Sequence, residues 1–369
     1  MNDLQFKLNA ERKQNGQSFA DISEAARLAA ESRPDCFVVV VCKEQIAQQI
    51  ATVEAALAAG ADLPLAGLTF CVKDNLDVAG FATTGNCPSF GEIAKETAPA
   101  VQLAIAAGAI LIGKNTMDQF ATGLNGTRAP EPICRNAINS DIIPGGSSSG
   151  SAVAVAADIC DFSLGSDTGG SGRVPAAANG IVGLKPTPGI ISARGMLYCN
   201  RSFDVVPIFA KTVQDAACVF DVLCKADPLD PFAFQGRVLP APGALEMTGA
   251  QYAIPADLNH FGDEAAKHAH QTNLRALEQA GATLIEVDFA PFAETGDLVF
   301  KSALVAERLV DYGDFIADAP GAVVPAVAQA INAGREYSAR DLYEVLHRLA
   351  ELSFNVTRSL IRLMRWLCR

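Results

Sequence analysis

The 369-residue chain is 50% hydrophobic, 19% charged and 7% aromatic, and its 29 basic and 41 acidic side chains give a net charge of −12. A chain this apolar buries enough surface to fold, which excludes an intrinsically disordered protein. Its negative charge repels phosphate backbones and argues against a nucleic-acid partner. No apolar run reaches the ~20 residues that cross a bilayer, so no membrane partner is expected.

Helical and strand patterns alternate along most of the chain, starting with Ala-rich helical spacing over residues 18–60 that stops at Gly60. We assign residues 1–60 to an N-terminal helical layer. Further strands are predicted at 65–73, 109–112, 161–166, 252–255 and 283–287, and further helices at 98–107, 149–157 and 263–280. A Pro- and Gly-rich connection is predicted at 226–247. This alternation predicts an α/β fold with helices on both faces of a sheet.

The ten cysteines include no CxxC pair, and most stand in apolar stretches such as FVVVVC and GLTFCV. This distribution is typical of buried, reduced thiols and predicts a cytoplasmic protein. The four histidines all lie in the last third of the chain, without metal-ligand spacing. We therefore expect no metal site and no cofactor. The N-terminus has no apolar core of a secretory signal, and none is expected.

Two Gly-rich segments suggest phosphate binding, but their sequences argue against it. Gly108 to Lys114 approximates a P-loop, yet Asn115 stands where Ser or Thr is required, and the residues between are an apolar strand. The segment GGSSSGS at 145–151 has no lysine and no GxGxxG. Nucleotide binding is not expected.

Acyl transfer by a serine requires a base, because a free hydroxyl is a poor nucleophile. No histidine precedes His260, and GxSxG does not occur around these serines. Lysine remains, and Lys73 follows the apolar GLTFCV directly. Burial would lower its pKa from ~10.4 towards ~7–8, the range of a useful base. Taken singly, Lys73 is more often a strand-end charge and GGSSSG more often a flexible loop.

Three segments together are far more specific: VKDN at 72–75, GGSSSGSAVAVA at 145–156 and GSDTGGSGRVPAA at 165–177. They resemble the amidase signature family, whose catalytic triad is Ser–cis-Ser–Lys. The match covers about residues 60–225, with looser similarity to about residue 352. The resemblance implies an α/β/α sandwich with a mixed central sheet. It places Lys73 on the base, Ser147 on the bridging serine at a cis peptide and Ser171 on the nucleophile.

The resemblance also implies an oxyanion hole, formed by backbone N–H groups of the turn containing Thr168, Gly169 and Gly170. Glycines suit this role because no Cβ blocks N–H groups that converge on a developing oxyanion. The neutral Lys73 would take a proton through Ser147 while Ser171 attacks an amide carbonyl. Ammonia would leave, and water would hydrolyse the acyl-enzyme.

Within the family the chain is most similar to allophanate hydrolases, through segments such as DNLDVAGFATT, DQFATGLNGTR and VAER. The implied partner is a small-molecule amide, allophanate, and Arg308 maps to the arginine that binds its carboxylate. Phe300 and Gly123 map to the same substrate pocket. The alternative is a general amidase, or the glutamine-amidase subunit of a tRNA amidotransferase, although SSSG and Arg308 argue against the latter. We further expect a homodimer.

The chain departs from the family pattern at several positions. Phe300 stands where a tyrosine is expected, Lys114-Asn115-Thr116 replaces Lys-Thr-Asn, and Glu131 adds a carboxylate near the expected anion site. We assign residues 61–352 to an amidase domain without its C-terminal strands and residues 353–369 to an aberrant tail, as from a frameshifted or truncated reading frame. An inactive fragment, or a non-catalytic binding subunit, is therefore the alternative from another class.

Overall fold

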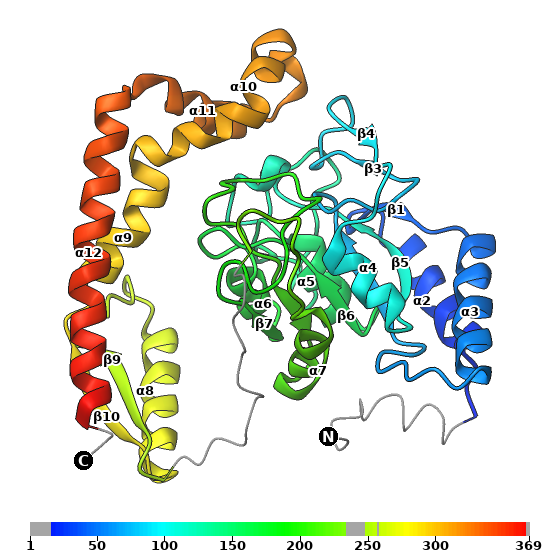
Figure 1. The fold of residues 1–369 in the computed structure, drawn as a ribbon, viewed down its shortest axis with the longest axis horizontal. Coiled ribbons are helices and arrows are strands. Elements are labelled where there is room, and N and C mark those ends of the chain that lie inside the picture. Colours follow the sequence, from blue (N-terminus) through cyan, green and yellow to red (C-terminus); the bar gives the residue numbers. More distant parts are fainter. Residues whose placement is uncertain (1–15, 234–247, 257, 367–369) are drawn as a thin grey trace. The chain divides into compact units, whose positions relative to one another are not determined.

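The computed structural model describes residues 16–233, 248–256 and 258–366 (Figure 1). Contacts divide the chain into two compact units. The first comprises Met1–Arg237 and Ala306–Gly334, and the second comprises Val238–Val305 and Arg335–Arg369. Most of the predicted connection at 226–247 lies outside the described residues. Two separate segments of the chain therefore form the first unit, and the second segment contains Arg308.

A six-stranded sheet in the order β1-β5-β2-β6-β8-β7 forms the centre of the first unit. Its strands are β1 (Phe37–Val40), β2 (Thr69–Lys73), β5 (Ile110–Asn115), β6 (Phe162–Leu164), β7 (Val182–Leu184) and β8 (Ile208–Ala210). β2 pairs in parallel with β5 and β6, whereas β1, β8 and β7 join through antiparallel pairs. This confirms the predicted α/β class with a mixed central sheet. β3 (Ala82–Thr83) and β4 (Glu92–Ile93) form a separate antiparallel pair.

Strand β1 lies within residues 18–60, whose spacing predicts helix. Helices α2 (Phe19–Glu31) and α3 (Lys43–Ala58) occupy most of that range, but the residues between them pair antiparallel with β5. The β1 sequence is FVVV, and β-branched and aromatic residues favour a pleated, half-buried strand. The N-terminal layer thus contributes an edge strand to the sheet as well as two helices.

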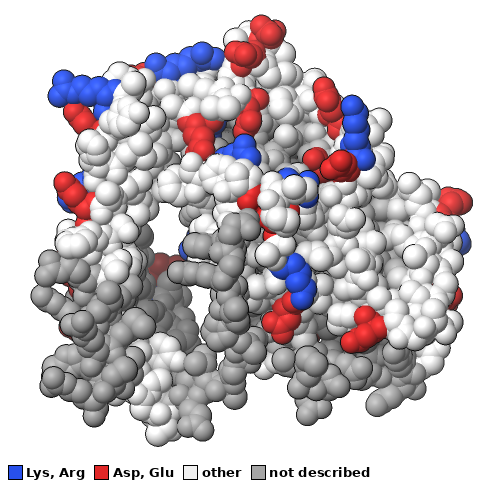
Figure 2. Space-filling model, in the orientation of Figure 1, with Lys and Arg blue, Asp and Glu red and all other residues white. Residues whose placement is uncertain are grey.

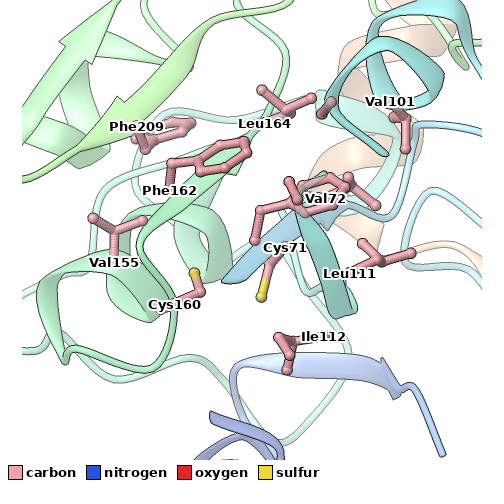
Figure 3. Packing of buried hydrophobic residues seen from close by; sticks show 14 of the residues in the cluster. Cys71, Val72, Val101, Leu111, Ile112, Val155, Cys160, Phe162, Leu164 and Phe209 are labelled. Atoms are coloured by element: carbon pink, nitrogen blue, oxygen red, sulfur yellow. The ribbon is translucent and has the colours of Figure 1, made fainter. Parts of the chain in front are cut away.

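Helices pack on this sheet around an apolar core. They are α4 (Pro99–Ala106), α5 (Ser149–Ala156), α6 (Arg173–Ala178) and α7 (Val213–Leu223). Helix α5 contacts β2, β5, β6 and β8, while α7 contacts β7, β8 and α4. Figure 3 shows Phe162 and Leu164 of β6 beside Val72 of β2. Phe70 stacks on Phe162 with ring centroids 5.1 Å apart, and burying each ring contributes about 1.5–3 kcal/mol. This packing holds the end of β2 and the start of α5 in place.

The later segment of the first unit contains α10 (Arg308–Asp318) and α11 (Pro325–Asn332). Tyr312 of α10 is fully buried and stacks on Phe120 at a centroid distance of 4.3 Å. Its hydroxyl donates to the Tyr198 carbonyl oxygen at 2.6 Å. Short 3-10 turns complete the elements: η1 (Gln119–Ala121), η2 (Ala303–Glu307), η3 (Pro320–Ala322) and η4 (Ala333–Glu336). The aromatic stack and the Tyr312 hydrogen bond tie α10 to the earlier part of the unit.

The second unit contains a parallel pair of strands, β9 (Gln251–Pro255) and β10 (Thr283–Val287), connected by α8 (Glu264–Gln279). It also contains α9 (Ala290–Lys301) and α12 (Ala339–Trp366), which pack on each other. Arg348 of α12 pairs with Glu294 of α9 at 2.6 Å. Helix α12 is continuous to Trp366, so most of the segment assigned to an aberrant tail is helical, and residues 367–369 lie outside the described residues.

On the face seen in Figure 2, acidic and basic side chains lie interspersed among uncharged residues. Of the described cysteines, six are buried as predicted, whereas Cys42 is exposed. Among the helices that the structure describes, none is long and apolar enough to cross a membrane.

Candidate active site

Lys73 is the last residue of β2, a strand that is buried along its whole length. Its Nζ donates to Ser147 Oγ and to Ser166 Oγ, both at 2.7 Å. Burial lowers the pKa of the Lys73 ammonium to about 8, although the negative charge of Asp204 partly opposes this shift. The structure therefore brings the predicted base and the predicted bridging serine into direct contact.

Ser147 lies in the Gly/Ser segment before α5, and the peptide bond between Gly146 and Ser147 is cis, as the family resemblance implies. The Ser147 carbonyl oxygen accepts the Asp118 N–H at 3.0 Å. A Cβ at Gly146 would overlap Asp118 Oδ2, so only glycine fits at this position. Asp118 thus contacts the backbone on both sides of the cis peptide bond.

Ser171 lies in the turn of residues 166–172 that joins β6 to α6, called the oxyanion turn below. Ser171 is buried, and its carbonyl oxygen accepts the Ser148 N–H at 3.4 Å. Asp167 organises the turn, because its carboxylate accepts the N–H groups of Gly170 at 2.7 Å and Gly172 at 3.0 Å. Burial alone would raise the pKa of Asp167, but the hydrogen bonds and the charge of Arg173, together with the N–H groups of Gly170 and Gly172, lower it below its ordinary value.

The turn engages its N–H groups unequally. The Gly170 N–H is bonded to Asp167, so Gly170 does not have the free N–H expected of an oxyanion donor. In the part of the chain that the structure describes, no acceptor takes the N–H of Thr168, Gly169 or Ser171. The free donors are therefore those of Thr168, Gly169 and Ser171, and whether they bind an oxyanion remains a prediction.

Asp204 is a buried site residue that the sequence motifs do not mark. It accepts the Thr168 hydroxyl, the Cys199 N–H at 2.6 Å and the Asn200 N–H at 3.3 Å. Burial raises the pKa of Asp204 to about 6, against the effect of these hydrogen bonds. Arg308, the first residue of α10, is also buried, and its Nε donates to Asn200 Oδ1 at 3.1 Å. The structure thus links Arg308 to the oxyanion turn through residues 198–205, called the site loop below.

The other sequence-predicted residues are placed differently. Gly123 lies against Asp118, where a Cβ would overlap the carboxylate. Glu131 is exposed and accepts the Ile133 N–H at 3.0 Å. Phe300 is on α9 of the second unit and is 40% exposed. A pocket role for Gly123 and Phe300 remains a prediction.

Comparison with known proteins identifies the family. The family model described as Amidase matches residues 23–354, which is most of the chain. The chain belongs to the amidase family. This confirms the resemblance predicted from the lysine and the two Gly/Ser segments.

Individual amidases resemble the chain over much of its length. It is 37% identical to urea amidolyase of Saccharomyces cerevisiae over 300 residues, which is 81% of this chain and 16% of the yeast protein. It is 39% identical to the A-subunit of glutamyl-tRNA(Gln) amidotransferase from Deinococcus deserti, over 70% of this chain and 53% of that protein. The allophanate hydrolase structure of Kluyveromyces lactis superposes with a TM-score of 0.82 at 32% identity, covering 93% of this chain and 59% of that one. The amidase thus spans only part of each of these relatives.

Proposed function

We propose that this amidase hydrolyses the terminal amide of allophanate, a small urea-derived carboxylate, and releases ammonia through a serine acyl-enzyme. One observation carries the proposal: a fully buried lysine with its pKa lowered to about 8 donates to Ser147 Oγ at 2.7 Å. A buried lysine next to a serine hydroxyl is an arrangement suited to moving a proton. The free N–H groups beside Ser171 supply the complementary stabilisation of negative charge.

The proposed reaction acylates Ser171 and then hydrolyses the acyl-enzyme. Neutral Lys73 takes the proton of Ser147, and Ser147 takes that of Ser171 as the Ser171 Oγ bonds to the amide carbon. The carbonyl oxygen becomes an oxyanion bound by the N–H groups of Thr168, Gly169 and Ser171. The Lys73 proton returns through Ser147 to the leaving nitrogen, the C–N bond breaks, and ammonia departs. Water then adds to the acyl carbon by the same relay and frees Ser171.

Arg308 supports a carboxylate-bearing substrate. A guanidinium matches a planar carboxylate in charge and in hydrogen-bond geometry. The bond from Arg308 Nε to Asn200 holds the plane of the group in one orientation. The similarity to urea amidolyase and to an allophanate hydrolase structure supports the same class of substrate.

The test is ammonia release by the purified chain from allophanate, biuret, malonamide and simple amides. We expect Ser171→Ala to abolish release. Ser149→Ala is a matched control from the other Gly/Ser segment, because the Ser149 hydroxyl is buried and has no hydrogen-bond partner among the described residues. It should leave release within about twofold of the unmodified chain. Equal traces from the unmodified chain and Ser171→Ala would refute the proposal and favour an inactive or purely binding protein.

A glutamine amidase is the second candidate, supported by 38–40% identity to several A-subunits of glutamyl-tRNA(Gln) amidotransferases. Glutamine carries a positive α-amino group as well as a carboxylate, so it offers a different charge pattern to Arg308. Ammonia release from glutamine exceeding that from allophanate, each compared at equal concentration, would favour this candidate.

A further inference from the structure

Asp204 joins two parts of the site that are far apart in sequence. On one side it accepts the hydroxyl of Thr168, whose N–H is one of the free donors of the oxyanion turn. The next residue, Val205, pairs with Asp167 through two backbone hydrogen bonds of 3.0 and 3.1 Å. The site loop is therefore bonded to the oxyanion turn at two consecutive positions, of which only Asp204 uses a side chain.

The other side of the site loop holds the start of α10. Asn200, whose N–H bonds to Asp204, accepts Arg308 Nε at 3.1 Å and donates to Glu307 Oε2 at 3.4 Å. The Glu307 carboxylate also accepts the Ser202 N–H at 3.1 Å. A continuous set of hydrogen bonds thus runs from Thr168 through Asp204 and Asn200 to Arg308.

We propose that Asp204 is a positioning residue that sets the distance between the oxyanion turn and Arg308. This inference rests on the proposed function, in which a substrate is held at its carbonyl by the turn and at its carboxylate by Arg308. Such a substrate has a fixed length, so both contacts form together only if the turn and the guanidinium are correctly spaced. A misplacement of about 1 Å can cost roughly 100-fold in rate.

The chemistry at this position requires a carboxylate rather than an amide. All of its bonded partners are donors: one hydroxyl and two backbone N–H groups. An ionised carboxylate only accepts hydrogen bonds, whereas an asparagine would turn its NH₂ group towards at least one donor. A buried donor left without an acceptor is costly, so the loop would shift to relieve it.

The principal test compares Asp204→Asn with Asp161→Asn as a matched control. Asp161 is likewise buried and accepts the N–H and the hydroxyl of Thr69, at 2.8 and 3.0 Å, but at the opposite end of β2 from Lys73. The substrates are allophanate and biuret, which has the same length but ends in an amide instead of a carboxylate. We expect Asp204→Asn to lower kcat about 10- to 100-fold on both, and to raise KM about tenfold for allophanate alone. Asp161→Asn should leave both constants within about threefold.

Thr168→Val provides a second, milder variant that removes only the hydroxyl. It should lower kcat about tenfold without changing KM, and adding it to Asp204→Asn should cause little further loss, because the two residues share one hydrogen bond. Asn200→Ala should raise the KM for allophanate about tenfold and leave biuret unaffected. These variants keep the proposal testable if Asp204→Asn does not fold.

Binding separates this proposal from the proposed function. Malonamate, which is allophanate with CH₂ in place of its central N–H, can be titrated by calorimetry into the Ser171→Ala variant with and without Asp204→Asn. About tenfold weaker binding supports the role of Asp204 even if the unmodified chain releases no ammonia. The proposal is overturned if Asp204→Asn changes the kcat and KM of the unmodified chain, and the malonamate affinity of Ser171→Ala, by less than about twofold. It is equally overturned if Asp161→Asn causes the same losses, or if KM rises alike for allophanate and biuret.

Discussion

Turnover by this amidase should follow the titration of Lys73, because only the neutral amine can take a proton from Ser147. Burial lowers the pKa of Lys73 from its ordinary 10.5 to about 8. At pH 7, a pKa of 8 leaves about one lysine in ten neutral, whereas a pKa of 10.5 would leave about one in 3,000. Burial therefore increases the supply of base about 300-fold, which is equivalent to about 3 kcal/mol.

We expect kcat/KM for allophanate to rise nearly tenfold per pH unit below pH 8 and to level off above it. The measurement is ammonia release at half-unit steps from pH 6.5 to 9.5. Lys73→Met should lower kcat about 10²- to 10⁴-fold and abolish this dependence, whereas Lys43→Met, at an exposed position, should change neither. A flat profile between pH 6.5 and 9.5, or a rise that continues undiminished to pH 9.5, would refute Lys73 as the base.

Four further outcomes are expected. Between pH 8 and 10.5 the unfolded chain binds a proton that folded Lys73 has lost. The free energy of unfolding, measured in urea, should therefore rise with pH by about 3 kcal/mol relative to Lys73→Met. The same pH dependence of the unfolding free energy in both proteins would contradict this. Asp167→Asn leaves N–H groups of the oxyanion turn without their acceptor and should destabilise the protein by about 2–4 kcal/mol in the same assay; an unchanged midpoint would count against it. Gly146→Ala forces a Cβ into the Asp118 carboxylate, so the melting temperature and ammonia release should both fall, and a variant with normal values would show that the backbone yields easily. Arg308→Lys loses the planar fork, so the KM for allophanate should rise about 10- to 100-fold while the KM for biuret stays constant; equal changes would exclude carboxylate binding by Arg308.

The site residues that lie in contiguous sequence motifs could be predicted from the sequence. Lys73 and Ser147 were predicted as partners, and the structure places them 2.7 Å apart. Asp204 and Asn200 could not be predicted in the same way, because an acidic residue and an amide in a loop carry no local pattern. Their importance depends on burial and on donors from other segments, which only the arrangement of the strands brings together. The position of β8 next to β6 is what places the site loop beside the oxyanion turn.

Two details of the fold and the site depend on contacts between segments that are distant in sequence. The Ala-rich residues around β1 have a strong helical pattern, and four strand-forming residues are too few to interrupt it without knowledge of their pairing with β5. The choice of oxyanion donors depends on where the Asp167 carboxylate points. Because the carboxylate points towards the Gly170 N–H, that group is already hydrogen-bonded. The sequence DTGGS does not reveal this direction.

The second entry of the chain into the first unit has a consequence for synthesis. Arg308 and its partner Asn200 are separated by 108 residues, and the chain passes through the second unit in between. At ~5–20 residues per second, Arg308 leaves the ribosome roughly 5–30 s after Ser171. During that interval a nascent chain holds the lysine and the serines but not the arginine that we propose binds the substrate carboxylate. A chain that folds as it is synthesised would therefore bring Lys73, Ser147 and Ser171 together before the proposed substrate-binding arginine is made.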